Sequence, residues 1–307
     1  MLISFLLLVI GFVLLVRGAD TFVDGAVSIA RRFNIPPIVI GTTLVAIGTS
    51  APEAAISITA AIAGSEGVSI GNIIGSNITN IFLILGLTAV IAALPIRKNT
   101  KFYELPFVGA ITLLLCLVGF WFGEISRITA MAFLTLFVGF IIYTIVIAKK
   151  SNEPTEDYKK IPMVETIVMI VAGIAALVIG SNLTVDSATD IATRFGVSDR
   201  VIGLTLVAIG TSLPELVVCV AAALKREYDM AVGNIVGSNI FNILFVLGTT
   251  AAISPLPFEH AFVIDGLVAL LAIIMLMIFV ARRSRLSRMG GILFLITYAG
   301  YVAWLVV

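Results

Sequence analysis

The chain has 307 residues, of which 60% are hydrophobic and 12% charged, and its 19 basic and 18 acidic side chains nearly cancel. Soluble globular domains carry about 25% charged residues, so the composition excludes that class and, with a mean hydropathy of +1.17, indicates a polytopic membrane protein. A helix needs about 20 apolar residues to cross a bilayer. Ten such spans occur, near 2–30, 38–63, 68–94, 105–122, 128–148, 164–190, 201–224, 230–252, 261–281 and 289–307.

Basic residues are distributed unevenly among the loops between these spans. If the spans alternate in direction, the loops that join odd spans to the following even spans hold most of the lysines and arginines. The opposite loops hold only Arg127, Arg194 and Arg200. The positive-inside rule then places the first set in the cytoplasm and both termini on the extracellular or periplasmic side.

Two segments of the sequence recur at a fixed distance. GTTLVAIGTSAPE at 41–53 recurs as GLTLVAIGTSLPE at 203–215, and GNIIGSNITN at 71–80 recurs as GNIVGSNIFN at 233–242. Both pairs have the same offset, since 203 minus 41 equals 233 minus 71. A register without gaps over that distance indicates a duplicated unit.

Each unit contains five spans, an odd number, so the second copy must enter the membrane from the opposite side. We predict an all-α polytopic membrane protein with ten transmembrane helices in two inverted-topology repeats. The first repeat is 1–148 with its motif at 41–82, the cytoplasmic linker is 149–161, and the second repeat is 162–307 with its motif at 203–244. In secondary transporters of this kind, ion sites lie near the midplane between the repeats.

The recurring motifs place polar groups inside apolar spans. If the second and seventh spans are helical, each presents two hydroxyls and a carboxylate on one face: Thr49, Ser50 and Glu53, and Thr211, Ser212 and Glu215. The third and eighth spans add Asn72, Ser76 and Asn80, and Asn234, Ser238 and Asn242, at steps of four positions. Pro52 and Pro214 remove a backbone donor each, so nearby carbonyls are candidates for release from the helix.

These groups form an all-oxygen set with two buried acids, which is the environment of a hard cation. Calcium accepts six to eight oxygens at flexible geometry, and sodium is close to it in size. A buried acid in a membrane span indicates a functional site, so we expect a bound ion to neutralise Glu53 and Glu215. Asn77 and Asn239 lie off the polar faces, and we predict that they serve packing or capping instead of ligation.

At GTSAPE and GTSLPE, followed by GNIIGSNITN and GNIVGSNIFN, the sequence resembles the cation/calcium antiporter superfamily, and within it the prokaryotic sodium/calcium exchangers. The resemblance covers nearly the whole chain. It implies ten helices, with ion sites in the second, third, seventh and eighth and with the first and sixth sliding past them. The implied ligands are the carbonyls of Ala46 and Ala208 and the side chains of Thr49, Ser50, Glu53, Ser76, Asn80, Thr211, Ser212, Glu215, Ser238 and Asn242.

One implied ligand departs from some members of that superfamily. Relatives that include potassium-dependent exchangers carry aspartate where this chain has Asn242, and the amide argues against potassium dependence. The linker at 149–161 is too short for the cytoplasmic calcium-sensing domain of eukaryotic exchangers.

The expected protein is a monomeric, multi-pass antiporter of the plasma (inner) membrane that exchanges Na⁺ for Ca²⁺ and has no resident cofactor, enzymatic activity or nucleic-acid partner. We expect the exchange to be electrogenic and independent of K⁺. The nearest alternative is an H⁺/Ca²⁺ exchanger, because buried glutamates can also cycle protons. A cation channel and a structural scaffold fit less well. An intramembrane hydrolase, which could bury a carboxyl pair that shares a proton, is more remote.

Overall fold

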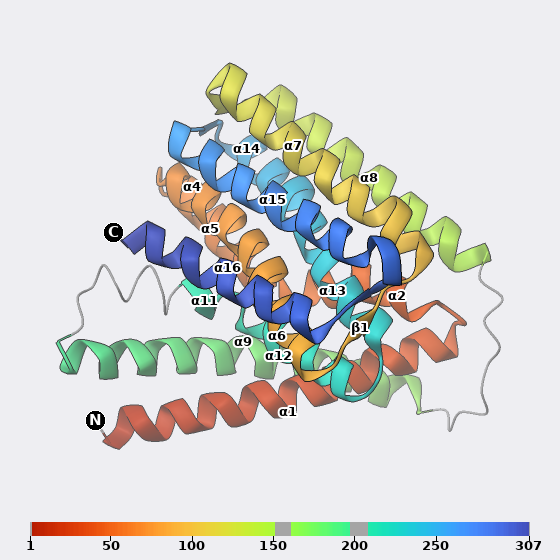
Figure 1. The fold of residues 1–307 in the computed structure, drawn as a ribbon. Helices are drawn as coiled ribbons and strands as arrows, with labels where there is room; N and C mark the ends of the chain where they lie inside the picture. The colour runs from red at the N-terminus through yellow and green to blue at the C-terminus, as the bar shows by residue number, and fades with distance from the viewer. Residues whose placement is uncertain (1, 151–160, 197–207, 307) are drawn as a thin grey trace.

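The computed structural model describes residues 2–150, 161–196 and 208–306, and nearly all of them are helical (Figure 1). Within these residues, eight helices are long and apolar enough to span a membrane, and a ninth results if the bent pair Pro37–Thr49 and Ala51–Ile62 is one span. The predicted seventh span begins among residues 197–207, which lie outside the described residues. The all-α membrane class is confirmed, and the count of ten stays a prediction.

The two halves of the chain contain matching series of helices. The first half holds α1 (Leu2–Arg32), α2 (Pro37–Ile40), η1 (Gly41–Val45), α3 (Ala46–Thr49), α4 (Ala51–Ile62), α5 (Glu66–Thr79), η2 (Asn80–Leu85), α6 (Gly86–Ile91), η3 (Thr100–Glu104), α7 (Leu105–Phe122) and α8 (Arg127–Lys150). The second holds α9 (Met163–Arg194), α11 (Ala208–Gly210), α12 (Leu213–Leu224), α13 (Tyr228–Ile240), η5 (Phe241–Leu247), α14 (Gly248–Ile253), α15 (His260–Arg283) and α16 (Arg288–Val306). The η elements are π-helical. The starts of α4 and α12 have the same offset as the sequence motifs, and so do the starts of α6 and α14.

Two very short antiparallel strand pairs connect the halves. Strand β1 (Leu94–Pro95) pairs with β4 (Arg285–Leu286), and β2 (Glu124–Ile125) pairs with β3 (Leu256–Pro257). In each pair one strand comes from a loop of the first half and the other from a loop of the second. The leucines and the isoleucine of these strands are fully buried, so each pair fixes an interhelical loop against the opposite half.

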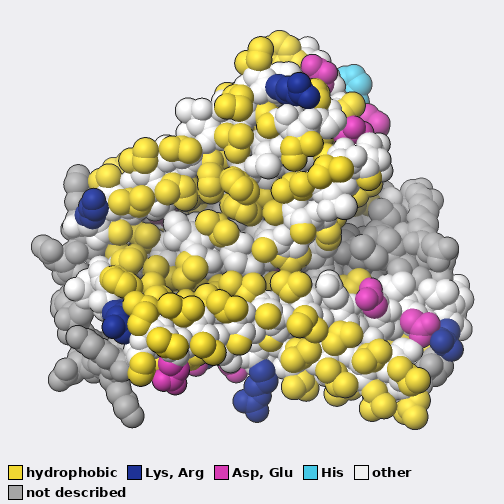
Figure 2. Space-filling view, turned by 180° about the vertical axis from the view of Figure 1, so that it is seen from behind, with side chains coloured by type: hydrophobic (Ala, Val, Ile, Leu, Met, Phe, Trp, Pro, Cys, Tyr) yellow, Lys and Arg dark blue, Asp and Glu magenta, His cyan; other side chains and the backbone are white. Residues whose placement is uncertain are grey.

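Helices α5 and α13 form the centre of the molecule, and the remaining helices surround them. The span that includes α13 is almost entirely buried, and the one that includes α5 is mostly buried. The surrounding helices expose large hydrophobic side chains, and Figure 2 shows such side chains covering most of one face, with charged groups mainly toward its edges. That distribution is expected when the surrounding solvent is lipid.

The two longest helices, α1 and α9, pack side by side along one edge of the molecule (Figure 1). They contain 31 and 32 residues, and each is therefore about 45 Å long. Because the hydrocarbon core of a bilayer is only about 30 Å thick, helices of this length must tilt. The Ser4 hydroxyl donates to Asp190 at 2.5 Å and Ser28 pairs with Thr166 at 3.0 Å, so the helices are antiparallel.

Small residues at every seventh position form the contact between α1 and α9. The repeating positions are Ser4, Gly11, Gly18 and Gly25 on α1, and Thr166, Gly173, Gly180 and Ser187 on α9. A Cβ atom added at Gly180 would lie 2.9 Å from the carbonyl oxygen of Gly11 and 2.9 Å from the amide nitrogen of Leu15. Glycine is therefore required for the backbones to approach this closely, and larger side chains such as Phe22 pack against the glycines of the opposite helix.

We predict that Gly180→Ala destabilises the protein. Alanine in a helix is normally about 0.5 to 1 kcal/mol better than glycine, but here its methyl group would overlap backbone atoms of α1, and overpacking costs about 1 to 3 kcal/mol. The matched control is Gly300→Ala on α16, where an added Cβ meets nothing within 4 Å. In thermal unfolding of the detergent-solubilised protein, Gly180→Ala should lower Tm and Gly300→Ala should leave it equal or higher. Equal shifts in the two variants would contradict the close contact.

Candidate cation site

The polar motifs lie where two helices are broken. Helix α3 ends at Thr49, Ser50 has the non-helical angles φ −86° and ψ 9°, and α4 begins at Ala51 with a change of direction of 48°. Ser212 has nearly the same angles before α12. The span predicted near 38–63 is therefore broken within its length, and Pro52 lies in the first turn of the second helix, the position where a helix tolerates proline.

The breaks place both carboxylates at helix N-termini. Glu53 lies in the first turn of α4 and Glu215 in the first turn of α12, and each is only 1% exposed. The first turn of a helix has backbone N–H groups without intrahelical partners and the positive end of the helix dipole. Both features stabilise a negative charge that the membrane interior would otherwise disfavour.

Each carboxylate accepts a hydrogen bond from the motif of the other half. The Ser50 hydroxyl donates to Oε1 of Glu215 at 2.7 Å, and the Ser212 hydroxyl donates to Oε1 of Glu53 at 3.4 Å. Thr211 also interacts with Glu53, and Thr49 with Glu215. The two motifs, which lie in different halves of the sequence, therefore form one site.

Several buried oxygen atoms of this site have no hydrogen-bond partner. Among the described residues, six such atoms belong to predicted ligands: Oε2 of Glu53, Oγ of Ser76, Oδ1 of Asn80, Oε2 of Glu215, Oγ of Ser238 and Oδ1 of Asn242. Buried polar atoms are almost always hydrogen-bonded in proteins. A set of unpaired oxygens around two carboxylates fits a cation that would satisfy them together.

Four asparagines fix the orientation of two of these oxygens. The amide nitrogen of Asn80 donates to Oδ1 of Asn239 at 2.9 Å, and that of Asn242 donates to Oδ1 of Asn77 at 3.1 Å. Asn77 and Asn239 each donate to the other's backbone carbonyl at 3.4 Å. Because the amide nitrogens of Asn80 and Asn242 are engaged in this way, their oxygens remain available to a ligand.

The asparagine network was only partly predictable from the sequence. Asn77 and Asn239 were predicted to be packing or capping groups, and they are not among the unpaired atoms. They accept hydrogen bonds from the amide nitrogens of Asn80 and Asn242, two predicted ligands that lie three positions farther along each helix. The only signal in the sequence was that both recur at the offset of the two motifs.

Other predicted groups support the backbone near the carboxylates. Asn72 donates to the Glu53 carbonyl at 3.3 Å and Asn234 donates to the Glu215 carbonyl at 3.5 Å. The Ala46 carbonyl accepts the backbone N–H of Ser50 at 3.0 Å. The Thr49 hydroxyl, which has one hydrogen to donate, lies 3.0 Å from Oδ1 of Asn234, 3.1 Å from the Val45 carbonyl and 3.3 Å from the Ala46 carbonyl.

In the second half of the chain, the Gly210 carbonyl has a hydrogen-bond partner outside its own helix. Pro214 cannot donate to Gly210, and the Gly210 carbonyl accepts the Ser181 hydroxyl of α9 at 2.7 Å. Ala208 begins the described part of this span, and its own side chain lies outside the described residues. The Gly210 oxygen therefore links the site to α9.

π-Helical turns occur in both halves next to these residues. Asn80 is the first residue of η2, and Asn242 is the second residue of η5. A π-turn inserts one residue into a helix and changes the direction of the side chains around it, and such turns are frequent at functional sites. The sequence motifs gave no indication of these turns.

The arrangement can hold a hard cation. Its donors are hydroxyl, amide, carbonyl and carboxylate oxygens, and the described residues contain no cluster of three or more histidines, cysteines and acids. Two acids among neutral oxygens suit an ion of one or two charges that accepts irregular coordination, such as calcium. The charge to be neutralised comes from Glu53 and Glu215 alone.

Several known proteins resemble this chain over nearly its whole length. The model of the family described as sodium/calcium exchanger protein matches residues 3–146 and 165–307. The chain is 40% identical to a putative antiporter, CaxA, of Alkalimonas amylolytica over 98% of both chains. It is 33% identical to the sodium/calcium exchanger MaX1 of Methanosarcina acetivorans over 98% of this chain and 97% of that one. A solved structure of the sodium-calcium exchanger NCX_Mj, soaked without Na⁺ and Ca²⁺, is 36% identical, covers 99% of both chains and superposes with a TM-score of 0.87.

We predict that Asn239→Ala weakens cation binding although Asn239 itself offers no free oxygen. Without its partner, the Asn80 amide can rotate and present nitrogen to the ion. The loss of a buried hydrogen bond is worth about 0.5 to 1.5 kcal/mol, which corresponds to roughly a twofold to thirteenfold rise in Kd. Isothermal titration with Ca²⁺ measures it, and Asn99→Ala, at an exposed residue that precedes η3, is the control. Unchanged affinity in Asn239→Ala would contradict the role of the network.

Proposed function

The chain belongs to the sodium/calcium exchanger protein family, and on that premise we propose that it exchanges Na⁺ for Ca²⁺ across the plasma membrane as a secondary antiporter. The observation that carries this proposal is the set of six unpaired buried oxygens around two carboxylates that are each hydrogen-bonded by the opposite half. The relatives MaX1 and NCX_Mj are both named as sodium/calcium exchangers, and these names support Na⁺ and Ca²⁺ as the exchanged ions. The ions are substrates, and the protein has no resident cofactor.

The proposed ligands are those implied by the sequence resemblance. They are the carbonyls of Ala46 and Ala208 and the side chains of Thr49, Ser50, Glu53, Ser76, Asn80, Thr211, Ser212, Glu215, Ser238 and Asn242. Unpaired oxygens on six of them support this set. The serine and threonine hydroxyls of the two motifs lie beside the carboxylates, and they can turn their lone pairs to an ion that replaces the hydrogen bond.

The charge of the two carboxylates determines whether each exchange cycle moves net charge across the membrane. Two carboxylates neutralise one Ca²⁺ or two Na⁺, so any further Na⁺ held by neutral oxygens would carry net charge across the membrane. Each elementary charge moved couples about 2.3 kcal/mol per 100 mV of membrane potential. Because Asn242 is an amide, it adds no third charge, and we propose electrogenic exchange that does not require K⁺.

The proposed architecture is a monomer with two inverted five-helix repeats, 1–148 and 162–307, joined by a cytoplasmic linker at 149–161, with both termini outside. The equal offsets of α4 and α12 and of α6 and α14 support it. The strand pairs support it as well, because each joins a loop of one repeat to a loop of the other. Alternating access would then move α1 and α9 relative to the central helices.

Transport measurements in proteoliposomes test the proposal. Vesicles loaded with Na⁺ and diluted into Na⁺-free medium should take up ⁴⁵Ca²⁺, and Glu53→Gln should abolish the uptake because a neutral amide cannot balance the ion. The matched control is Glu165→Gln, which removes an exposed acid from the first turn of α9. An imposed pH gradient without Na⁺ should drive no uptake.

The outcomes separate the alternatives. Uptake driven only by the pH gradient, and lost in Glu53→Gln, would replace Na⁺ coupling by proton coupling at the same glutamates. Uptake that survives in Glu53→Gln at the wild-type rate would overturn the assignment of the site. Loss of uptake in Glu165→Gln as well would indicate a general loss of folding or insertion.

We predict that K⁺ is not needed for exchange. The initial rate of Na⁺-driven ⁴⁵Ca²⁺ uptake should be equal in K⁺ and choline media when the membrane potential is held at the same value, because Asn242 offers no charge for a cotransported K⁺. A rate that rises severalfold on adding K⁺ under these conditions would contradict the prediction.

We also predict that the membrane potential drives exchange. If more than two Na⁺ leave the vesicle for each Ca²⁺ that enters, net positive charge moves outward in every cycle. A potential that is positive inside should therefore accelerate ⁴⁵Ca²⁺ uptake, and a potential that is negative inside should slow it. Equal rates at the two potentials would instead indicate electroneutral exchange of two Na⁺ for one Ca²⁺.

A further inference from the structure

A cavity of about 570 Å³ lies away from the cation site, between η3 and α7 on one side and α8 on the other. Its walls include the aromatic residues Phe102, Tyr103, Phe107, Phe140 and Tyr143, together with Glu104. None of these helices supplies a ligand to the proposed ion site. A volume between about 300 and 1,000 Å³ is typical of sites that bind small organic molecules.

Glu104 is the unusual feature of this cavity. Its side chain is buried, with 5% of the residue exposed, and its Oε2 atom has no hydrogen-bond partner among the described residues. The hydroxyl of Tyr143, which interacts electrostatically with Glu104, also has no partner in that part of the chain. Burial of an acid costs free energy unless it is paired, so a cation that reached these two oxygens would satisfy both. Each oxygen is itself almost inaccessible, so binding requires the two side chains to turn toward the cavity.

The nearby basic residues are engaged elsewhere. Arg97 pairs with Asp229 of α13. Lys101 donates to the Ala281 carbonyl at 2.5 Å, and its ammonium lies 5.1 Å from the ring centre of Phe102. None of the ion pairs within the described ranges includes Glu104, so the protein does not itself supply the missing cation there.

The chemistry of the walls selects the kind of cation. A metal ion would require about six oxygens, but the side chains of the cavity wall offer only those of Glu104, Tyr103, Thr135 and Tyr143. An organic ammonium needs fewer acceptors and is attracted to aromatic ring faces. A primary ammonium has three N–H donors, which can serve Oε2 of Glu104 and the Tyr143 hydroxyl together.

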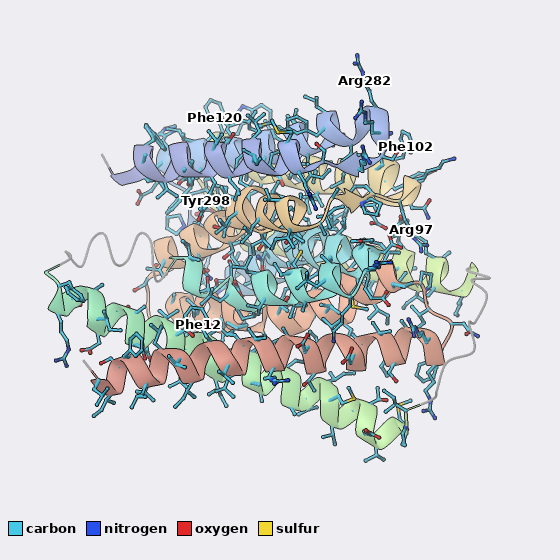
Figure 3. All side chains as sticks on the ribbon, turned by 60° about the horizontal axis from the view of Figure 1, so that its bottom comes forward. Phe12, Arg97, Phe102, Phe120, Arg282 and Tyr298 are labelled. Atoms are coloured by element: carbon cyan, nitrogen blue, oxygen red, sulfur yellow. The ribbon has the colours of Figure 1, made fainter. Side chains whose placement is uncertain are left out.

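The position of the cavity indicates that the cation carries an apolar chain. Phe102 lies at the end of the molecule where Arg97 and Arg282 gather (Figure 3), and Phe102 and Tyr103 are largely exposed. Exposed aromatic residues next to basic ones are typical of the membrane interface. From Glu104 the walls continue through Phe107, Leu136 and Gly139, which offer contact to a hydrocarbon tail.

We propose that this cavity binds an amphiphile with a primary ammonium head, whose nitrogen pairs with Glu104 and Tyr143 and whose chain lies between α7 and α8. Two sources have this chemistry: an aminophospholipid of the membrane and a free long-chain amine. The cavity is separate from the proposed ion site, because its residues do not contact Glu53 or Glu215 in any described hydrogen bond or ion pair.

Two variants test separately the contact with the ammonium head and the contact with the hydrocarbon chain of the proposed ligand. Glu104→Gln removes the charge at nearly constant size. Gly139→Leu fills the cavity, and it should fold because a Cβ added at Gly139 meets nothing within 4 Å. The controls are Glu165→Gln, which removes an exposed acid, and Gly300→Leu, at another glycine where an added Cβ meets nothing within 4 Å.

The experiment uses the full chain in dodecyl maltoside. Native mass spectrometry measures retention of phosphatidylethanolamine, phosphatidylcholine or phosphatidylglycerol with equal acyl chains, and thermal unfolding measures the shift in Tm on adding dodecylamine. We expect the phosphatidylethanolamine adduct, the dodecylamine shift or both. Each signal that appears should fall at least tenfold in Glu104→Gln and Gly139→Leu and stay unchanged in both controls.

The binding pattern shows whether the ligand is a membrane lipid or a free amine, and it can also overturn the proposal. Preferential retention of phosphatidylethanolamine identifies a membrane lipid, whereas a dodecylamine shift without lipid preference identifies a free amine. Equal retention of the three lipids with no dodecylamine shift would overturn the proposal. Wild-type binding in the folded Gly139→Leu variant would overturn it too, even if Glu104→Gln failed to fold.

Discussion

The structure depends on the burial of two carboxylates in a membrane interior. Glu53 and Glu215 are nearly inaccessible, and a charge at this depth is disfavoured by at least about 2.5 kcal/mol. Each acid lies at the N-terminus of a helix and accepts a hydrogen bond from a hydroxyl of the opposite half. Since each acid depends on the other half for this bond, the two halves must pack against each other for the site to exist.

This requirement explains why the most polar helices are the most buried. Helices α5 and α13 carry asparagines and serines that would be costly in lipid, and they are enclosed by helices whose outer surfaces are apolar (Figure 2). The asparagine network between them engages the amide nitrogens that would otherwise face a cation. The unpaired oxygens that remain are held by a closely packed centre.

The contact between α1 and α9 differs from this centre in kind. Small residues recur there at every seventh position, and the two backbones come close together. The C-terminal part of α1 also forms ion pairs with the loop between α12 and α13: Lys225 pairs with Asp24 at 2.6 Å and Arg31 pairs with Glu227 at 3.3 Å, both partly exposed. Burial raises the pKa of Glu227, and the adjacent Arg31 partly offsets the rise. Exposed ion pairs of this kind contribute little stability, so they would oppose the proposed movement of α1 against the central helices only weakly.

The sequence by itself determined the membrane class, the duplication and the residue types of the site. Hydropathy, the constant offset of the two motifs and the two acids in apolar spans are visible without coordinates, because lipid burial and duplication act directly on composition and order. Pro52 also indicated a disturbed helix, but its place in the first turn of α4 is visible only in the structure.

Only the tertiary structure decided how these residues meet. Ser50 bonds to Glu215 and not to Glu53, Asn239 holds Asn80, and Ser181 takes the carbonyl that Pro214 releases. Each of these contacts joins residues at least 29 positions apart. Helical periodicity relates a side chain only to neighbours three or four positions away. Which distant helix faces it is set by the packing of the whole bundle.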